Sequence, residues 1–176
     1  MKSNIALVGF MGAGKTDVGR FLAKKLGKNF IETDTLIAQQ AGKSIPEIFE
    51  QDGEIAFREL EIEITKRVAR EKDTVIACGG GAVLNKINID RLREGAVIVY
   101  LTASPKTVLK RVASAAGKRP LLAVDNPILT IGELLRFRRP FYERVADIRI
   151  NTSRLTIPAV VGQIIAELKR IESLNT

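Results

Sequence analysis

The sequence lacks histidine and tryptophan, and it contains a single cysteine, Cys78, among its 176 residues. Without histidine, a general base has to be an aspartate, glutamate, lysine, tyrosine or the cysteine. Ser-His-Asp triads and histidine-dependent metal sites are excluded. One cysteine cannot form an intrachain disulfide, which fits a reducing compartment. Because Cys78 follows the apolar run 75–77, we expect a buried strand thiol rather than a reactive one.

Long hydrophobic runs are also missing. The apolar run near the N-terminus is too short for a signal peptide or a membrane span, so we expect a cytoplasmic protein that has no membrane partner. Aromatic residues make up only 5% of the chain. Because so few rings are available for bases to stack on, we expect no nucleic-acid partner. The net charge of +8 fits small anionic substrates, with a plain basic surface as the alternative.

Short runs rich in Val and Ile alternate with helical patterns along the chain. We predict strands at residues 5–8, 30–33, 75–78, 97–101 and 147–150. Helices are predicted at 15–26, 35–41, 45–50, 54–70, 87–93, 105–112, 128–144 and 157–174, with a Ser44–Glu47 capping box before the third. Five strands alternating with helices indicate an α/β fold around a five-stranded parallel sheet. The least regular stretch, 114–126, is typical of a mobile lid or a passive surface loop.

Residues 9–16, Gly-Phe-Met-Gly-Ala-Gly-Lys-Thr, match the P-loop pattern G-x-x-x-x-G-K-[ST] in full. A predicted strand precedes this segment and a predicted helix follows it, which is the context that the motif requires. The backbone N–H groups of Gly12, Ala13 and Gly14 and the start of the helix suit the binding of ATP phosphates. Lys15 can bridge the β- and γ-phosphates, and the Thr16 hydroxyl can bind Mg²⁺.

Two carboxylates, Glu32 and Asp34, follow the second predicted strand. Ligands of parallel sheets collect at the carboxyl ends of the strands, so both carboxylates are expected on the P-loop side. Asp34 can orient an acceptor hydroxyl and accept its proton, while Glu32 can hold the Mg²⁺ water shell. The alternative for Asp34 is a helix cap.

Further motifs resemble the shikimate kinase family over nearly the whole chain. They are Thr33-Asp34, the segments 42–49, 52–54 and 57–61, Gly79-Gly80-Gly81-Ala82, Arg119-Pro120-Leu121-Leu122, Arg138, Pro140, Tyr142 and Ala146-Asp147. The resemblance implies a three-layer α/β/α P-loop NTPase fold in one domain, residues 1–176. It also implies substrate-binding helices at about 35–61 and a lid at about 112–126.

The same resemblance implies an enzyme that transfers the γ-phosphoryl group of ATP to the 3-hydroxyl of shikimate, in aromatic amino-acid biosynthesis. Asp34 would bind substrate hydroxyls and act as the base, and Arg58 and Arg138 would hold the carboxylate. The turn Gly79, Gly80, Gly81 would contact substrate through backbone N–H groups. Read without the family, Arg58 could form a surface pair with Glu54 worth about 0.3–0.5 kcal/mol, and the glycines could be a tight turn. Phe49 and Phe57 would border the apolar side of the substrate ring, or serve only as core aromatics.

On the nucleotide side, the resemblance implies that Arg119 reaches the transferring phosphoryl group and that Arg111 and Arg154 grip adenine. Magnesium would be bound by Thr16 and Glu32, although the family usually has D-x-D where this chain has Glu32-Thr33-Asp34. We expect a monomer.

Two other function classes compete with this interpretation. A P-loop GTPase switch, or another nucleotide-regulated binding module, would need D-x-x-G and N-K-x-D. The first is absent, and Asn85-Lys86-Ile87-Asn88 ends in Asn. Another metabolite kinase, such as a gluconate kinase or a nucleoside monophosphate kinase, is the nearer alternative.

Overall fold

The computed structural model describes residues 2–114 and 125–174. Its centre is a five-stranded sheet in the order β2-β3-β1-β4-β5, and every pair of neighbouring strands is parallel. The strands are β1 (Asn4–Val8), β2 (Asn29–Glu32), β3 (Thr74–Ala77), β4 (Ala96–Thr102) and β5 (Ile148–Asn151). The predicted α/β fold with a five-stranded parallel sheet is therefore confirmed, and all five predicted strands exist.

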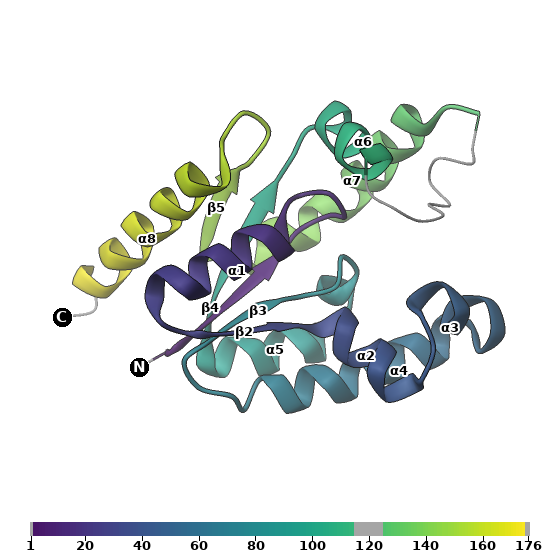
Figure 1. The fold of residues 1–176 in the computed structure, drawn as a ribbon, viewed down its shortest axis with the longest axis horizontal. Coiled ribbons are helices and arrows are strands. Elements are labelled where there is room, and N and C mark those ends of the chain that lie inside the picture. Colours follow the sequence, from purple (N-terminus) through teal and green to yellow (C-terminus); the bar gives the residue numbers. More distant parts are fainter. Residues whose placement is uncertain (1, 115–124, 175–176) are drawn as a thin grey trace.

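Helices cover both faces of the sheet, which gives three layers (Figure 1). One face packs against α1 (Lys15–Leu26) and α8 (Ile157–Leu174). The other face packs against α4 (Gly53–Val68), α5 (Lys86–Gly95) and α7 (Pro127–Val145). Alternate residues of each strand enter the two cores, as the pleat of a strand requires: Ile5 and Leu7 lie in one, Ala6 and Val8 in the other.

The remaining helices lie beyond the carboxyl ends of the strands or beside them (Figure 1). They are α2 (Thr33–Ala41), α3 (Ile45–Gln51), the 3₁₀ helix η1 (Ala82–Leu84) and α6 (Pro105–Ser114). Both α2 and α3 pack against α4. The predicted capping box at the start of α3 is present: the Glu47 carboxylate accepts from Ser44 N at 2.8 Å, and the Ser44 hydroxyl accepts from Glu47 N.

Some element boundaries differ from the prediction. Strand β2 ends at Glu32, and α2 begins at Thr33 rather than at residue 35. The Thr33 hydroxyl reaches across to β3: it donates to Ala77 O at 3.4 Å and accepts from Gly79 N at 3.0 Å. These contacts join the start of α2 to the end of β3. Strand β5 is shifted by one residue, to Ile148–Asn151, and η1 was not predicted.

Cys78 is buried and unpaired directly after β3, as predicted. Burial raises the pKa of its thiol to about 12, so the thiol remains protonated at neutral pH.

Candidate functional site

The P-loop connects β1 to α1 at the carboxyl edge of the sheet. Gly12 and Gly14 have φ angles of 74° and 98°, in the left-handed region that residues with a Cβ adopt at a cost. Gly14 is the N-cap of α1, so the unpaired N–H groups of the first helical turn open onto this loop. The segment thus has the local geometry of an anion site at a helix N-terminus.

Lys15 folds back over this loop. Its Nζ donates to the carbonyl oxygens of Gly9 and Phe10, at 2.7 Å and 2.9 Å. Burial lowers the pKa of Lys15 to about 8, against the opposing attraction of the Asp34 carboxylate. A buried ammonium that lies next to a carboxylate is suited to accept a second anion, because phosphate restores the charge compensation lost on burial.

Thr16 and Glu32, the two predicted metal ligands, lie in contact. The Thr16 hydroxyl donates to Glu32 Oε1 at 2.5 Å, and the Thr35 hydroxyl donates to Glu32 Oε2 at 3.3 Å. A hydroxyl and a carboxylate are oxygen ligands of the kind that Mg²⁺ binds. Among the described residues, no group of three or more carboxylate, histidine or cysteine side chains could hold a metal ion.

Asp34 lies in the first turn of α2 and is not its N-cap, which is Glu32. Its Oδ1 is shielded from solvent and accepts no hydrogen bond from any described residue. Burial raises the pKa of this carboxyl, Lys15 and Arg58 act in the opposite direction, and Glu32 adds to the rise. An acceptor oxygen without a partner at the centre of a polar site is a natural point for a ligand hydroxyl to bind.

The turn Gly79-Gly80-Gly81 brings the predicted acceptor residues together. A Cβ on Gly79 would lie 2.7 Å from Asp34 Oδ1, and one on Gly81 would lie 2.6 Å from both terminal nitrogens of Arg58. At Gly80, Arg138 Nη1 is the nearest side-chain atom, at 3.6 Å. Each glycine therefore faces one of the three charged side chains, and at Gly79 and Gly81 a methyl group would force that side chain to move.

Arg58 makes the surface pair that its spacing predicts, with Glu54 Oε1 at 3.3 Å. It also donates from Nη1 to Glu61 Oε2 at 2.9 Å, and the Glu61 side chain is only 1% exposed. Burial raises the pKa of Glu61, while Arg58 counteracts this rise. Sequence reasoning assigned Glu61 no role, although its position three residues after Arg58 on a helix was a usable signal.

Arg138 is distinguished from its basic neighbours by what it contacts. Its guanidinium carbon lies 5.4 Å from the centre of the Phe10 ring in the P-loop. Arg136 is exposed, and Arg139 pairs with Glu143 at 2.8 Å on the outer surface of α7. Of the three arginines, only Arg138 faces the glycine turn.

The predicted aromatic wall is formed by a close pair. The rings of Phe49 and Phe57 have centroids 4.6 Å apart, and Arg58 lies over Phe57 at 5.2 Å. Phe57 is buried, whereas Phe49 is 40% exposed, so the pair joins the core to the surface beside Arg58.

Arg111 joins the P-loop to the segment after β5. It donates from Nη1 to Gly12 O at 3.0 Å and to the Thr152 hydroxyl at 2.9 Å, and from Nη2 to Thr152 O at 2.7 Å. The buried Thr152 hydroxyl donates to Ala13 O or to Thr102 O, at 2.9 Å and 3.1 Å. Sequence reasoning missed Thr152. Arg154 is exposed in the following loop.

Arg119 and most of the predicted lid, residues 115–124, lie outside the described residues. The ends of this segment adjoin α6 and α7, which pack against each other. A small core of Phe10, Val108, Val112 and Ile131 connects both helices to the P-loop.

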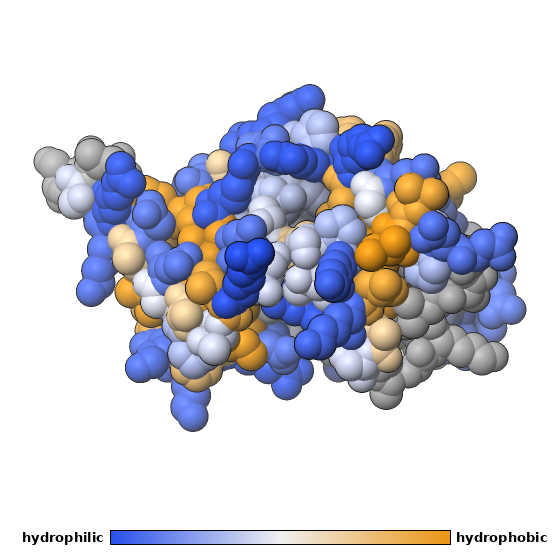
Figure 2. Space-filling model, turned by 90° about the horizontal axis from the view of Figure 1, so that it is seen from above, coloured by the Kyte–Doolittle hydropathy of each residue, from blue (hydrophilic) through white to orange (hydrophobic). Residues whose placement is uncertain are grey.

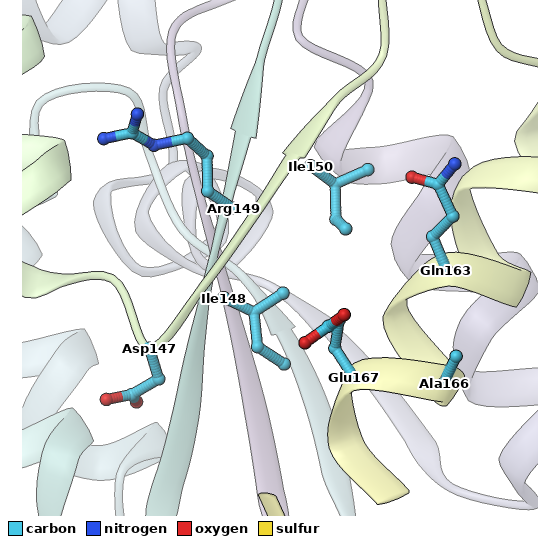
Figure 3. A pocket seen from close by; sticks show the side chains of 7 residues that line it. All are labelled: Asp147, Ile148, Arg149, Ile150, Gln163, Ala166 and Glu167. Atoms are coloured by element: carbon cyan, nitrogen blue, oxygen red, sulfur yellow. The ribbon is translucent and has the colours of Figure 1, made fainter. Parts of the chain in front are cut away.

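The surface around these elements is uneven. Seen from above, a mostly hydrophilic central area lies between hydrophobic areas (Figure 2). A separate hollow of about 430 Å³ lies along the outer strand β5, where Ile148 and Ile150 point toward α8 (Figure 3). None of the predicted site residues lines this hollow. Its lining residues are Asp147, Ile148, Arg149, Ile150, Gln163, Ala166 and Glu167. Within the described part of the chain, none of the helices has the length and apolar character needed to cross a bilayer.

The family model, two curated relatives and one solved structure name the same family. Residues 11–169 match the family model described as shikimate kinase. The chain is 49% identical to a shikimate kinase of Caldanaerobacter subterraneus subsp. tengcongensis, over 92% of this chain and 94% of that one. It is 47% identical to that of Moorella thermoacetica, over 99% and 100%. A solved shikimate kinase from Acinetobacter baumannii, in complex with shikimate, superposes with a TM-score of 0.89 at 37% identity, covering 97% of this chain and 94% of that one.

The lowered pKa of Lys15 predicts that ATP binding weakens as the pH rises through about 8. Above that pH the free protein has lost the Lys15 proton, and binding of an anion has to take the proton up again. We expect affinity to fall by up to about tenfold per pH unit above the pKa. Titration with a fluorescent ATP analogue, from about pH 6.5 to about pH 9.5, measures this dependence.

Lys15→Met is the matched control, because it keeps an unbranched side chain but has no titrating group. It should bind ATP more weakly throughout, with a flatter pH profile. An equally flat profile for the wild-type protein would contradict the prediction that the Lys15 ammonium is the titrating group that binds ATP.

Proposed function

The chain belongs to the shikimate kinase family and is an ATP-dependent kinase that phosphorylates shikimate, and we propose how its residues carry out this transfer. The acceptor is the 3-hydroxyl of shikimate, and the donor is the γ-phosphoryl group of ATP. Membership of this family excludes a GTPase switch, and it favours shikimate over gluconate or a nucleoside monophosphate as the acceptor. The observation that carries the residue assignment is the convergence of Asp34, Arg138 and Arg58 on the turn 79–81, beside the P-loop.

ATP binds with its phosphates over the P-loop. The N–H groups of Gly12, Ala13 and Gly14 and the N-terminus of α1 hold the phosphate oxygens. Lys15 exchanges its bonds to Gly9 O and Phe10 O for bonds to the β- and γ-phosphates. Because phosphoryl transfer spreads negative charge over the γ-oxygens, a fixed ammonium there stabilises the transition state.

Adenine lies beside Arg111, whose guanidinium is already held by Gly12 O and Thr152. A planar guanidinium fixed in this way can stack on a purine face. Arg154 supplies a second, exposed cation at the same end of the site.

Thr16 and Glu32 fit a magnesium ion by their chemistry, because both supply oxygen ligands and their side chains are already in contact. The other ligands would be phosphate oxygens and water, as is usual for Mg²⁺ in kinases. When bound, the ion would neutralise charge on the phosphates. The longer Glu32 side chain stands where the family usually has aspartate, and it reaches the Thr16 hydroxyl directly.

Shikimate binds beside the glycine turn 79–81, where Asp34, Arg58 and Arg138 converge. Arg58 and Arg138 hold its carboxylate, for which a guanidinium fork is well matched. Asp34 accepts a hydrogen bond from the reacting hydroxyl through its unpartnered Oδ1 and takes up the proton as the phosphoryl group transfers. The raised pKa of Asp34 makes it a better base than an exposed aspartate. The pair Phe49 and Phe57 borders the apolar side of the ring.

Arg119 supplies a further positive charge to the transferring phosphoryl group, in addition to Lys15 and Mg²⁺. This arginine belongs to the same chain as the rest of the site. The lid at about 112–126 and the substrate-binding helices at about 35–61 stay predictions, as does the single domain spanning 1–176. We also propose a monomer located in the cytoplasm; the single buried thiol of Cys78 fits that reducing compartment.

A coupled ADP-release assay with shikimate, gluconate and AMP as acceptors tests the reaction. We expect turnover with shikimate and only background rates with the other two. An enzyme that turns over gluconate or AMP faster than shikimate would contradict the substrate assignment.

Substitution within the glycine turn tests the acceptor geometry. Gly81→Ala places a methyl group 2.6 Å from the Arg58 guanidinium, so Arg58 has to move. Loss of a charged hydrogen bond of about 1.5–3 kcal/mol should raise the KM for shikimate by about 10- to 150-fold. The KM for ATP should change little.

Gly80→Ala is the control, because its Cβ would meet no atom closer than 3.6 Å. We expect this variant to stay near the wild-type KM. Equal effects of the two substitutions would show that the turn tolerates no side chain at all, and the specific role of Arg58 would be lost.

A further inference from the structure

Tyr142 on α7 is completely buried and makes one directed contact with the glycine turn. Its hydroxyl donates to the carbonyl oxygen of Gly80 at 2.5 Å. These residues are 62 positions apart in the sequence. The bond thus connects the last turn of α7 to the backbone between β3 and η1.

The Tyr142 ring is held in place by its surroundings. It stacks on Tyr100 of β4, with centroids 4.9 Å apart and planes at 17°. It also belongs to the core shared by Ala82 and Val83, the first two residues of η1. Because the ring is packed against both β4 and η1, it has little freedom to rotate. Its hydroxyl is therefore a hydrogen-bond donor in a fixed position.

Arg138, one helical turn before Tyr142, approaches the same hydroxyl. Burial raises the pKa of Tyr142 to about 12, and the nearby Arg138 guanidinium works against that rise. The hydroxyl therefore remains protonated, and it lies between the carboxylate-binding arginine and the turn.

The carbonyl of Gly80 and the N–H of Gly81 belong to one planar trans peptide unit, in which they point in opposite directions. Holding the carbonyl against α7 therefore directs the Gly81 N–H away from that helix. The N–H groups of Gly80 and Gly81 donate to no other residue of the described part of the chain. Both are available to a ligand.

We propose that Tyr142 is a positioning residue for the acceptor substrate, which sets the orientation of the Gly80–Gly81 peptide and of Arg138 through its hydroxyl. The proposal rests on the proposed function, since the ligand of that turn is the acceptor. Tyr142 touches neither substrate, and its effect is on acceptor affinity, because the groups that it orients bind shikimate before the transfer.

Tyr142→Phe tests this role by removing the hydroxyl and keeping the ring. We expect the KM for shikimate to rise at least fivefold, with the KM for ATP and kcat within twofold of wild type. Tyr100→Phe is the matched control: it removes the hydroxyl of the stacked partner, for which the described residues offer no hydrogen bond. It should leave all three constants unchanged.

An unchanged KM for shikimate in folded, active Tyr142→Phe would overturn the proposal. Failure of the proposed function itself would be recognised separately, as absence of shikimate turnover in the wild-type enzyme. Tyr142→Phe could instead raise the KM for shikimate and the KM for ATP equally and also lower the unfolding temperature. That result would show that the tyrosine is merely structural, and it would also overturn the proposal.

A second measurement does not depend on how the variant folds. The chain has only two tyrosines, so fluorotyrosine labelling gives two ¹⁹F signals, which Tyr100→Phe assigns. Shikimate should shift the Tyr142 signal and leave that of Tyr100 nearly in place. A Tyr142 signal that does not respond to saturating shikimate would contradict the proposal.

Discussion

The site depends on a stretch of backbone that carries no side chains. At the end of β3, Gly79 and Gly81 let the Asp34 carboxylate and the Arg58 guanidinium approach to distances that any Cβ would prevent. The P-loop lies beside the same turn, since Met11 N is 3.6 Å from the Cβ position of Gly80. Parallel pairing of β1 with β3 places both loops at one edge of the sheet, so the topology brings the proposed sites for the phosphoryl donor and its acceptor together.

Charge compensation explains why these groups can be buried together. Burial alone would neutralise Lys15, Asp34 and Glu61, and it shifts the pKa of each in that direction. Their opposite charges oppose these shifts, with Lys15 acting on Asp34 and Arg58 on Glu61. The Arg58–Glu61 pair has a second consequence: the guanidinium is already oriented before a carboxylate arrives, so less conformational entropy is lost on binding.

Much of this arrangement was predictable from the sequence, for identifiable reasons. The strands are short runs of Val and Ile, and the P-loop has a spacing set by phosphate geometry, so both are encoded locally. The start of α2 was placed two residues late because Thr33 bonds to β3, a contact that no local pattern reveals. The contacts of Thr152 and Tyr142 join segments 139 and 62 residues apart, and only the folded chain brings them together. The roles assigned to the site residues remain predictions.

Phe10 connects the two halves of the site. Its backbone carbonyl accepts from Lys15, while its ring lies under the guanidinium of Arg138. The same ring belongs to the small core that includes Val108 and Val112 of α6 and Ile131 of α7. In the proposed mechanism, phosphate draws Lys15 away from this carbonyl, and the loop that supports Arg138 then loses one of its internal bonds. Because packed interiors transmit small displacements instead of absorbing them, we expect the proposed nucleotide and acceptor sites to share this cluster and not to be independent.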